Sequence, residues 1–337
     1  MSAPDLVTFG SLTLDNVVTA DGTRLPRNAG GNVVYAALGA ALWGGSVGLV
    51  SRAGADYPAD FLAMLEDRGL DLGGIARIDA PHGMNVAFAY RPDGSRVRAF
   101  PPEVVALIPP AERARFVDYT TLGTAHRYAI WIGFAPDGDD IPTSWLGLRG
   151  AHLAAMPVQR HLAITARLPA GAHVQVDSPW YDERTPGTDF HTPLLARIGL
   201  LLPSEADLAV WRPELPPLEA AALLARHTGR RILVKRGDAG CLLLGTDGAP
   251  DFAVPAFPVD AIDPTGAGDS FCGGVLAGIH RHGDLRQALV CGAVTASFTV
   301  SAAGLTGLLH ATREEAERRF GWLAQRTKVY REMETGP

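Results

Sequence analysis

The chain has 337 residues, of which 47% are hydrophobic and 20% charged, a composition typical of a folded globular protein. Its formal net charge is −6 and it contains no run of lysine and arginine, which argues against nucleic acid or an anionic membrane as a partner. The three cysteines form no C-x-x-C pair, and the first residues lack the pattern of a secretory leader. We therefore expect buried free thiols, no zinc site and a cytoplasmic protein.

Apolar runs bounded by turn residues alternate with helical patterns through most of the chain. In the first part, strands are predicted at Leu6 to Gly10 and Ser46 to Ser51, a helix between them at Val33 to Trp43, and a helix at Ala59 to Arg68. After Met156 the predicted elements are helix Val158 to Leu168, strands His173 to Asp177 and Gly199 to Leu202, helices Glu205 to Trp211 and Leu218 to His227, strands Arg231 to Lys235 and Cys241 to Gly245, and three helices beginning at Ala267, Leu285 and Arg313. This order predicts an α/β fold with a mostly parallel sheet covered by helices on both faces.

Two segments break this order. Thr13 to Arg24 and Met84 to Phe100 alternate apolar and polar residues, which is typical of exposed antiparallel strands. We expect them to form together a small antiparallel lid that projects from the main sheet, with strands roughly over residues 13–28 and 84–103. The segment Pro101 to Gly150 is rich in Pro, Gly, Tyr and Trp, and its pattern predicts no clear element.

The stretch DPTGAGDSFCGG, Asp263 to Gly274, carries the strongest chemical signal. No G-x-x-x-x-G-K-[ST] loop is present, so any phosphate must be held by another device. Gly266, Ala267 and Gly268 leave backbone N–H groups free of side chains at the start of a predicted helix, where an anion is favoured. Asp269 follows in the first turn, where it either caps the helix or accepts a proton from a hydroxyl beside a bound phosphate.

The motif D-P-T-G-A-G-D-S-F resembles the second signature of the PfkB-type, or ribokinase-like, carbohydrate kinases. Other stretches resemble the family's landmarks in the same order: Gly10 to Asp15, Gly30-Gly31-Asn32, Gly48 to Asp56, and Val234 to Gly240. The resemblance implies one ribokinase-like domain over residues 1–337, a three-layer αβα sandwich with the lid described above. It also implies a transferase that moves a phosphoryl group from ATP to an alcohol.

The resemblance further implies roles for single residues. Asp269 would be the general base, with Gly266, Ala267 and Gly268 forming the anion hole. Asp263 and Thr265 would hold a monovalent cation, potassium, together with main-chain groups near Ser301 to Gly304, and magnesium would accompany ATP. The implied substrate-binding residues are Asp15, Gly30, Gly31, Asn32 and Tyr35, and the implied nucleotide-binding positions are Ser204, Asp207, Lys235, Gly237, Gly240 and Gly304.

Departures from the family pattern affect the substrate more than the reaction. Tyr35 stands where the family commonly has a sugar-binding Asn, so it either contacts the acceptor with one hydroxyl or is simply packed under the lid. The family's N-x-x-E motif is Ser204 to Asp207 here, which suggests that the magnesium contact runs through water. Cys291 to Ala293 stands where many relatives have an Asn near adenine.

Three hypotheses for function follow from this pattern. The first is transfer of a γ-phosphoryl group to a hydroxyl, most simply a primary one, of a sugar or sugar-like molecule. The second keeps the reaction but takes a nucleoside, whose base would lie against Tyr35. The third, motivated by the altered Tyr35 and Ser204 to Asp207, is a retired kinase that only binds a sugar. Because the lid strands offer an exposed edge, we also expect a homodimer formed through the lid.

Overall fold

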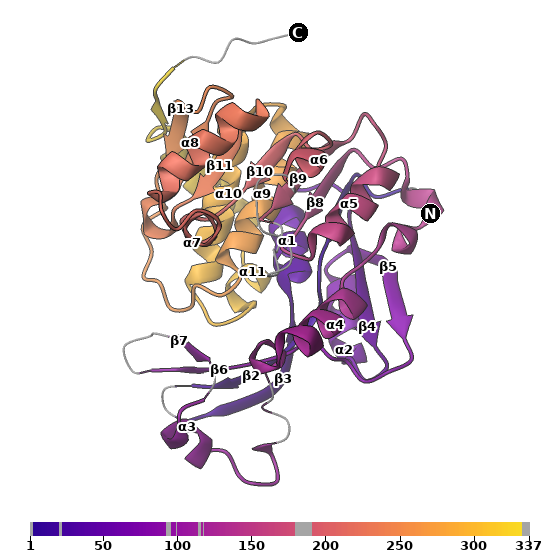
Figure 1. Cartoon of the computed structure of the whole chain (residues 1–337). Coiled ribbons are helices and arrows are strands. Elements are labelled where there is room, and N and C mark those ends of the chain that lie inside the picture. The colour runs from indigo at the N-terminus through magenta and orange to yellow at the C-terminus, as the bar shows by residue number, and fades with distance from the viewer. Residues whose placement is uncertain are drawn as a thin grey trace.

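The computed structural model describes residues 3–19, 22–91, 96–98, 100–113, 116, 118–178 and 191–331. Within these residues the strands form two separate sheets (Figure 1). The larger sheet has the spatial order β14 (Lys328–Val329), β13 (Pro250–Val254), β12 (Cys241–Leu244), β11 (Ile232–Lys235), β10 (Leu200–Leu202), β9 (His173–Asp177), β8 (Gly150–Leu153), β1 (Leu6–Phe9), β4 (Val47–Gly54), β5 (Leu70–Ile78). Its seven strands from β11 to β5 run parallel, and the β12, β13 and β14 end is antiparallel.

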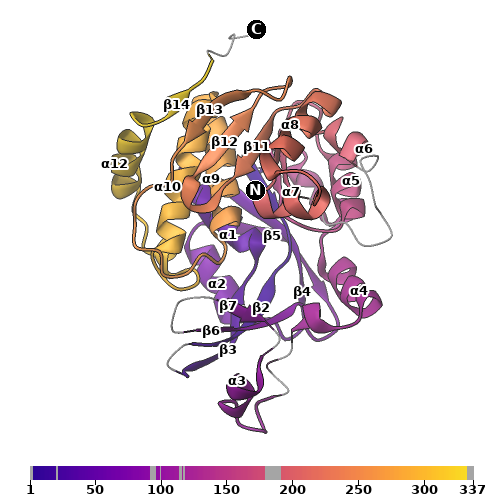
Figure 2. The ribbon, with the colours of Figure 1, turned by 60° about the vertical axis from the view of Figure 1, so that its left-hand side comes forward.

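Helices cover both faces of this sheet, as the predicted α/β order requires (Figure 2). One face packs against α1 (Asn32–Ala41), α2 (Ala59–Asp67), α9 (Ala267–His282), α10 (Leu285–Val300), α11 (Thr306–Leu309) and α12 (Arg313–Ala324). The other packs against α4 (Thr124–Phe134), α5 (Val158–Arg167), α6 (His191–Leu195), α7 (Glu205–Trp211) and α8 (Pro217–Thr228). No helix among the described residues is long and apolar enough to cross a membrane.

The central strands are apolar on both sides because each side contributes to a different core. In β11, Leu233 belongs to the core on the α9 face, whereas Ile232 and Val234 belong to the core on the α8 face. Successive side chains of a strand point to opposite faces, so a strand covered twice reads as a continuous apolar run. The sequence predicts β9 and α7 with the bounds that the structure has.

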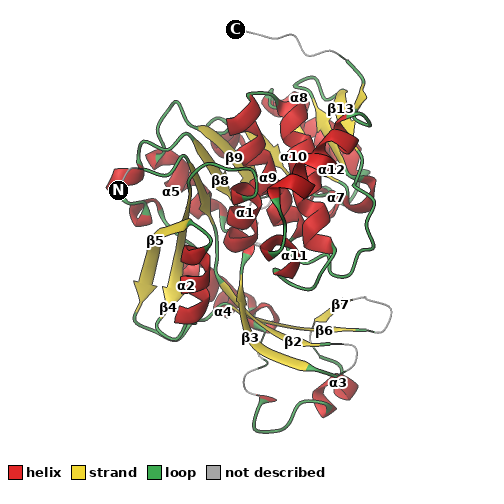
Figure 3. Cartoon of the chain, turned by 180° about the vertical axis from the view of Figure 1, so that it is seen from behind, coloured by secondary structure: helices red, strands yellow, loops and turns green. Residues whose placement is uncertain are grey.

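The smaller sheet has the order β3 (Arg24–Gly30), β2 (Thr13–Val18), β6 (Asn85–Tyr90), β7 (Arg96–Arg98), and we call it the lid (Figure 3). It lies beside α3 (Pro102–Ala106), away from the helical layers. The β2–β3 and β6–β7 pairs are antiparallel, as expected, while β2 and β6 pair in parallel. The expected turn at Pro92 to Gly94 lies outside the described residues.

The helix that carries the motif, α9, is buried between α1 and α10, and glycines allow the helices to approach closely. A Cβ on Gly273 would lie 1.9 Å from the Ala36 carbonyl oxygen of α1, and one on Gly278 would lie 2.6 Å from Cα of Ala288 in α10. Gly274 meets α10 in the same way, with Cys291 O at 2.9 Å. These contacts fix the start of α9 at the edge of the sheet where the parallel strands end.

Candidate active site

The motif forms a tight turn that opens α9. Gly266 is the N-cap and has φ 75°, a left-handed conformation that favours glycine. The Ala267 amide donates to the carbonyl oxygen of Pro264 at 3.2 Å and closes the turn. The first amides of a helix have no acceptor within the helix, so Gly268 and Asp269 present donors at its positive end. The turn is therefore suited to an anion.

Asp269 stands in the first turn of α9 and lines a cavity of about 490 Å³. Burial raises the pKa of its carboxyl group to about 7, and the negative charge of Asp177 adds to this effect. The ammonium of Lys235 acts in the opposite direction. A carboxylate with a pKa near neutrality is matched to accepting a proton in a reaction at neutral pH.

The cavity beside Asp269 lies between the lid and the sheet and draws its walls from distant parts of the chain. We call it the acceptor cavity. Asp15, Gly31, Asn32 and Tyr35, all predicted from the sequence, line it together with Gly266 and Asp269. The remaining lining residues are Ser11, Thr13, Met84, Val86, Phe88, Tyr119, Thr120, Arg127, Trp131, Ala155 and Thr265.

Asn32 and Gly31 shape the floor of the acceptor cavity. The Asn32 amide oxygen accepts from the Ser11 backbone N–H at 2.8 Å, and its nitrogen donates to the Ala155 carbonyl at 2.9 Å. Gly31 has φ 127°, and a Cβ there would lie 2.2 Å from the carbonyl oxygen of Ser11. The amide thus ties two strand ends together, and this holds the floor in place.

Asp15 and Tyr35 line two cavities at once. Asp15 accepts a hydrogen bond from the Thr13 hydroxyl at 2.8 Å. Tyr35 is 5% exposed, and burial together with Asp15, Asp263 and Asp269 raises the pKa of its phenol above the usual value, so the hydroxyl stays neutral. Both residues also line a second cavity of about 430 Å³. Gly30 lines this second cavity and not the acceptor cavity. The carbonyl of Gly30 accepts from the Tyr57 hydroxyl at 3.2 Å.

Sequence reasoning missed the contribution of the segment Pro101 to Gly150. Within it, α4 places Arg127 and Trp131, four residues apart and so on one face of the helix, in the wall of the acceptor cavity. Tyr119 and Thr120 precede that helix and line the same cavity. The spacing of Arg127 and Trp131 was the available signal, but the many prolines and glycines around it masked the helix.

A third cavity of about 540 Å³ lies on the other side of the turn. Gly237, Gly240 and Ala267 line it, and the rest of its wall is mostly apolar: Asp238, Ala256, Phe257, Pro258, Val259, Ala261, Pro264, Phe271, Ala293, Ala296, Ser297 and Val300. We call it the slot. The slot extends from the predicted nucleotide-side turn at Gly237 and Gly240 to Ala267 at the start of α9. Ala293, which also lines it, comes from the region predicted to lie near adenine.

Ser204 and Asp207 do not line the slot but cap α7. The Ser204 hydroxyl donates to the Asp207 carboxylate at 2.6 Å, and the Asp207 amide donates back to that hydroxyl at 3.1 Å. The Ser204 amide also donates to the Asp207 carboxylate at 2.8 Å, and the two bonds from backbone amides form a capping box at the start of the helix. The charge of Asp207 still acts on Asp269, whose pKa it helps to raise.

Asp263 joins the motif to the loop after α10. Its carboxylate is 4% exposed and accepts from the amide of Thr265 at 2.9 Å and from the amide of Gly304 at 2.9 Å. The structure therefore brings together the two segments that the resemblance paired. Across the described residues, no group of three or more His, Cys, Asp or Glu side chains is placed to hold a metal ion.

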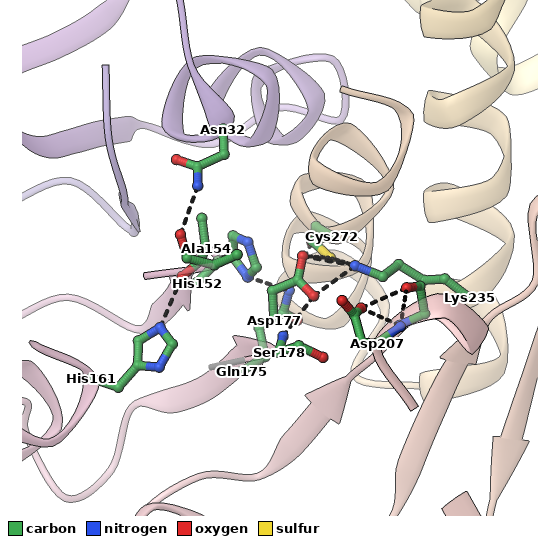
Figure 4. A network of polar contacts seen from close by, with 12 residues as sticks. Asn32, His152, Ala154, His161, Gln175, Asp177, Ser178, Asp207, Lys235 and Cys272 are labelled. Atoms are coloured by element: carbon green, nitrogen blue, oxygen red, sulfur yellow. Dashed lines mark hydrogen bonds and ion pairs between the residues drawn. The ribbon is translucent and has the colours of Figure 1, made fainter. Parts of the chain in front are cut away.

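Lys235 lies at the end of β11, beside the turn rather than in the slot. Its ammonium forms an ion pair with the Asp177 carboxylate at 2.7 Å (Figure 4). Burial would lower the pKa of Lys235, but the charge of Asp177 more than offsets this, so the amine stays protonated. Of the predicted site residues, the acceptor cavity and the slot bring together most, whereas Gly30 and Gly304 line the second cavity. Lys235 contacts the backbone of the turn at Gly268.

The parallel sheet, the turn at the start of α9 and the adjoining carboxylate form the arrangement that the resemblance to the ribokinase-like kinases implied. A sequence model of the pfkB family carbohydrate kinases matches residues 150–312. The chain is 28% identical over 290 residues to the cytidine kinase of Thermococcus kodakarensis, covering 86% of this chain and 93% of that protein. It is also 28% identical over 323 residues to fructokinase-1 of Oryza sativa subsp. japonica, covering 87% of this chain and 91% of that one.

A solved structure of similar fold is a putative ribokinase II from E. coli in complex with ATP and Mg²⁺. The TM-score is 0.68 at 18% sequence identity, with 96% of this chain and 100% of that chain covered. The chain is thus similar to the PfkB-type, ribokinase-like carbohydrate kinases, by the family model over residues 150–312 and by relatives at 28% identity over most of its length. It is accordingly a kinase of the class that acts on sugars or nucleosides.

Proposed function

We propose that the protein transfers the γ-phosphoryl group of ATP to a hydroxyl, most simply a primary one, of a sugar or sugar-like molecule, with Asp269 as general base. The observation that carries this proposal is the position of Asp269. It lines the acceptor cavity, while Ala267, two residues earlier, lines the slot, so the anion-binding turn separates the two.

The chemistry follows from this arrangement. The acceptor hydroxyl gives its proton to the Asp269 carboxylate as its oxygen attacks the γ-phosphorus. The bond from that phosphorus to the bridging oxygen breaks, and ADP leaves with the electron pair. The amides at the start of α9 stabilise the charge on the transferred group. Closure of the lid over the acceptor cavity would exclude water, the competing acceptor.

The slot fits the adenosine part of ATP because it is largely apolar and ends at Ala267 of the turn. Magnesium bound to the phosphates neutralises charge between the β- and γ-phosphates. Such an ion keeps several waters and needs few protein ligands, which suits the carboxylate of Asp207 acting through water.

A monovalent cation is a further part of the proposal. Asp263, Thr265 and the main chain near Gly304 are joined by hydrogen bonds, and a potassium ion there would stabilise the turn. Activity measured in potassium, sodium and tetramethylammonium salts tests this. At least about tenfold higher activity in potassium supports the site, and equal activity in all three salts contradicts it.

Asp269→Asn tests the reaction. We expect it to remove nearly all ADP formation while an ATP analogue still binds by calorimetry, because the amide keeps the shape but cannot take a proton. Asp260→Asn, an exposed acid near the same loop, is the matched control and should keep full activity. An active Asp269→Asn variant would overturn the proposal. ATP consumption with any acceptor would exclude a role limited to sugar binding.

A nucleoside is the second candidate acceptor. Phe88, Tyr119 and Trp131 line the acceptor cavity with aromatic rings, and a planar base would stack on them. The similarity to a cytidine kinase agrees with this alternative. Thermal shifts with sugars and with nucleosides, each in the presence of an ATP analogue, separate the two. Stabilisation by pentoses or hexoses alone rules out the nucleoside.

A homodimer formed through the lid is a separate proposal. β3 is an edge strand of the lid sheet, and an edge strand offers unpaired backbone groups to a second copy. Sedimentation of the full chain at micromolar concentration measures its mass. A monomer under those conditions would contradict this proposal and leave the proposed reaction untouched.

A further inference from the structure

A buried ion pair lies beneath the turn that opens α9. Lys235 at the end of β11 reaches across the end of β10 to Asp177 at the end of β9. Strands lie about 4.8 Å apart, so the pair spans about 10 Å of sheet edge. The ammonium is 2.7 Å from both carboxylate oxygens, and the side chains are only 12% and 7% exposed (Figure 4).

This ion pair is in contact with the first residues of α9. A Cβ on Gly268 would lie 3.5 Å from Nζ of Lys235, so the ammonium sits against the backbone of the turn. One turn further along, the Cys272 thiol lies 3.8 Å from the same ammonium and 4.0 Å from the Asp177 carboxylate. Gln175 of β9 donates to the Cys272 carbonyl at 2.7 Å. The start of α9 thus rests on the ends of β9 and β11.

Stability alone does not account for such a pair. Taking two charges out of water costs several kcal/mol per ion, and apolar replacements of buried pairs are often neutral or stabilising. Among the described residues, the further contact of the ammonium is the Cys272 thiol, and a thiol is a weak acceptor. A lysine held in this way keeps its positive charge directly against the backbone of the turn that opens α9.

We propose that Lys235 and Asp177 are positioning residues of phosphoryl transfer. Lys235 supplies a fixed positive charge beneath the turn that opens α9, and Asp177 holds that charge in place. The inference rests on the proposed function, since it assigns the pair to the same reaction. It differs from a direct contact with the nucleotide because neither residue lines the slot.

The two charges act on Asp269 in opposite directions. Asp177 raises the pKa of Asp269 and Lys235 lowers it. The other titratable groups that act on Asp269 or share its cavity come from several elements: Tyr35 of α1, Asp207 of α7, Cys272 of α9, Asp15 of β2, Tyr119, and Arg127 of α4. These stay unchanged in the variants below.

The test uses Lys235→Met, Asp177→Asn, the double variant and Lys235→Arg in the full chain. Lys235→Met should lower kcat at least about tenfold and move the acid limb of the pH profile upward, while affinity for ADP stays within about threefold of the parent. Asp177→Asn should move that limb downward. Lys235→Arg should recover activity, since it keeps the charge.

The double variant separates function from folding, because it leaves no unpaired buried charge. It should melt at or above the parent temperature and still have the low kcat. Arg281→Met, which removes the 2.7 Å ion pair with Glu317 at the other end of α9, is the matched control and should keep full kcat. Parental kcat and pH profile in the double variant would overturn the inference. That result leaves Asp269→Asn inactive, whereas failure of the proposed function leaves it active.

Discussion

The ring of Tyr35 packs directly on the backbone of Gly266, so that a Cβ on Gly266 would lie 2.3 Å from Cδ1 of the ring. Gly266 also has φ 75°, so two independent constraints require glycine there. Tyr35 lines the acceptor cavity and Gly266 opens α9. The contact therefore couples the wall of the acceptor cavity to the turn that opens α9, and it gives a structural role to the tyrosine that stands where the family commonly has an amide.

Gly266→Ala should disrupt this contact. The added methyl group would push the Tyr35 ring away or move the turn, and a left-handed alanine costs a further 1–2 kcal/mol, roughly. We expect kcat to fall by about 100-fold, because small displacements of reacting groups are costly. Steady-state ADP formation measures this loss.

The control for this substitution is Gly321→Ala. Gly321 lies inside α12, and in the described part of the chain nothing beyond the adjoining backbone of that helix comes within 4 Å of the added carbon. Alanine should stabilise that helix by about 0.5–1 kcal/mol and leave kcat unchanged. If Gly266→Ala were as active as Gly321→Ala, the coupling between Tyr35 and the turn would be wrong.

The pH dependence of the reaction should report Asp269. Its pKa is raised to about 7, and only the deprotonated carboxylate can accept a proton. Activity should therefore rise with pH up to about 7 and level off above it, as kcat/KM for the acceptor at saturating ATP and magnesium measures. An acid limb near pH 4 would show that the group is not desolvated in the working enzyme.

Arg127→Ala tests the role of α4 in binding the acceptor. Arg127 lines the acceptor cavity, so its loss should raise KM for the acceptor by about tenfold with little change in KM for ATP. His126→Ala is the matched control, because this neighbour on α4 is exposed. Equal KM values for the two variants would remove α4 from the binding surface.

Two ion pairs differ in burial and should differ in strength. Arg52 of β4 bonds Asp140 at 2.7 Å with side chains 21% and 12% exposed, and it also donates to the carbonyl of Gly133 in α4. Arg167 bonds Asp139 at 3.0 Å with side chains 43% and 89% exposed. Arg52→Met should cost about 2–4 kcal/mol because it leaves the mostly buried Asp140 carboxylate without a positive charge beside it, whereas Arg167→Met should cost less than about 1 kcal/mol.

Chemical denaturation with both variants checks this ranking. A similar loss of unfolding free energy in the two would contradict it. Since Arg52 ties α4 to the sheet, its variant should also raise KM for the acceptor, which Arg167→Met should not do.

Helix starts that depend on neighbouring residues in the sequence were predicted correctly. The starts of α9, α10 and α12 were predicted because acids, glycines or a threonine cap precede apolar helical spacing. β8 was missed since Gly150 to Leu153 is a short run without alternation, buried on both faces. β5 was missed because two glycines interrupt it, Gly73 and Gly74; Gly74 gives room to Trp145.

For the site, the resemblance to the PfkB-type kinases implied the turn and four of the residues that line the acceptor cavity with Asp269, namely Asp15, Gly31, Asn32 and Tyr35. It could not predict the wall of the acceptor cavity, because Arg127 and Trp131 reach it only through the packing of α4 against the end of β4. Nor could it predict that Lys235 pairs with Asp177, since two strands separated by 58 residues meet only in the finished sheet.

The glycines of α9 have a consequence for protein engineering and for natural variation. Glycine inside a helix costs about 1 kcal/mol relative to alanine, so Gly273, Gly274 and Gly278 look like the first targets for raising thermal stability. Each instead packs so closely against a neighbouring helix that no space is left for a Cβ atom. Alanine at any of them would force α1 or α10 outward and carry the anion-binding turn with it, so a more heat-resistant version of this enzyme has to be sought outside its most glycine-rich helix.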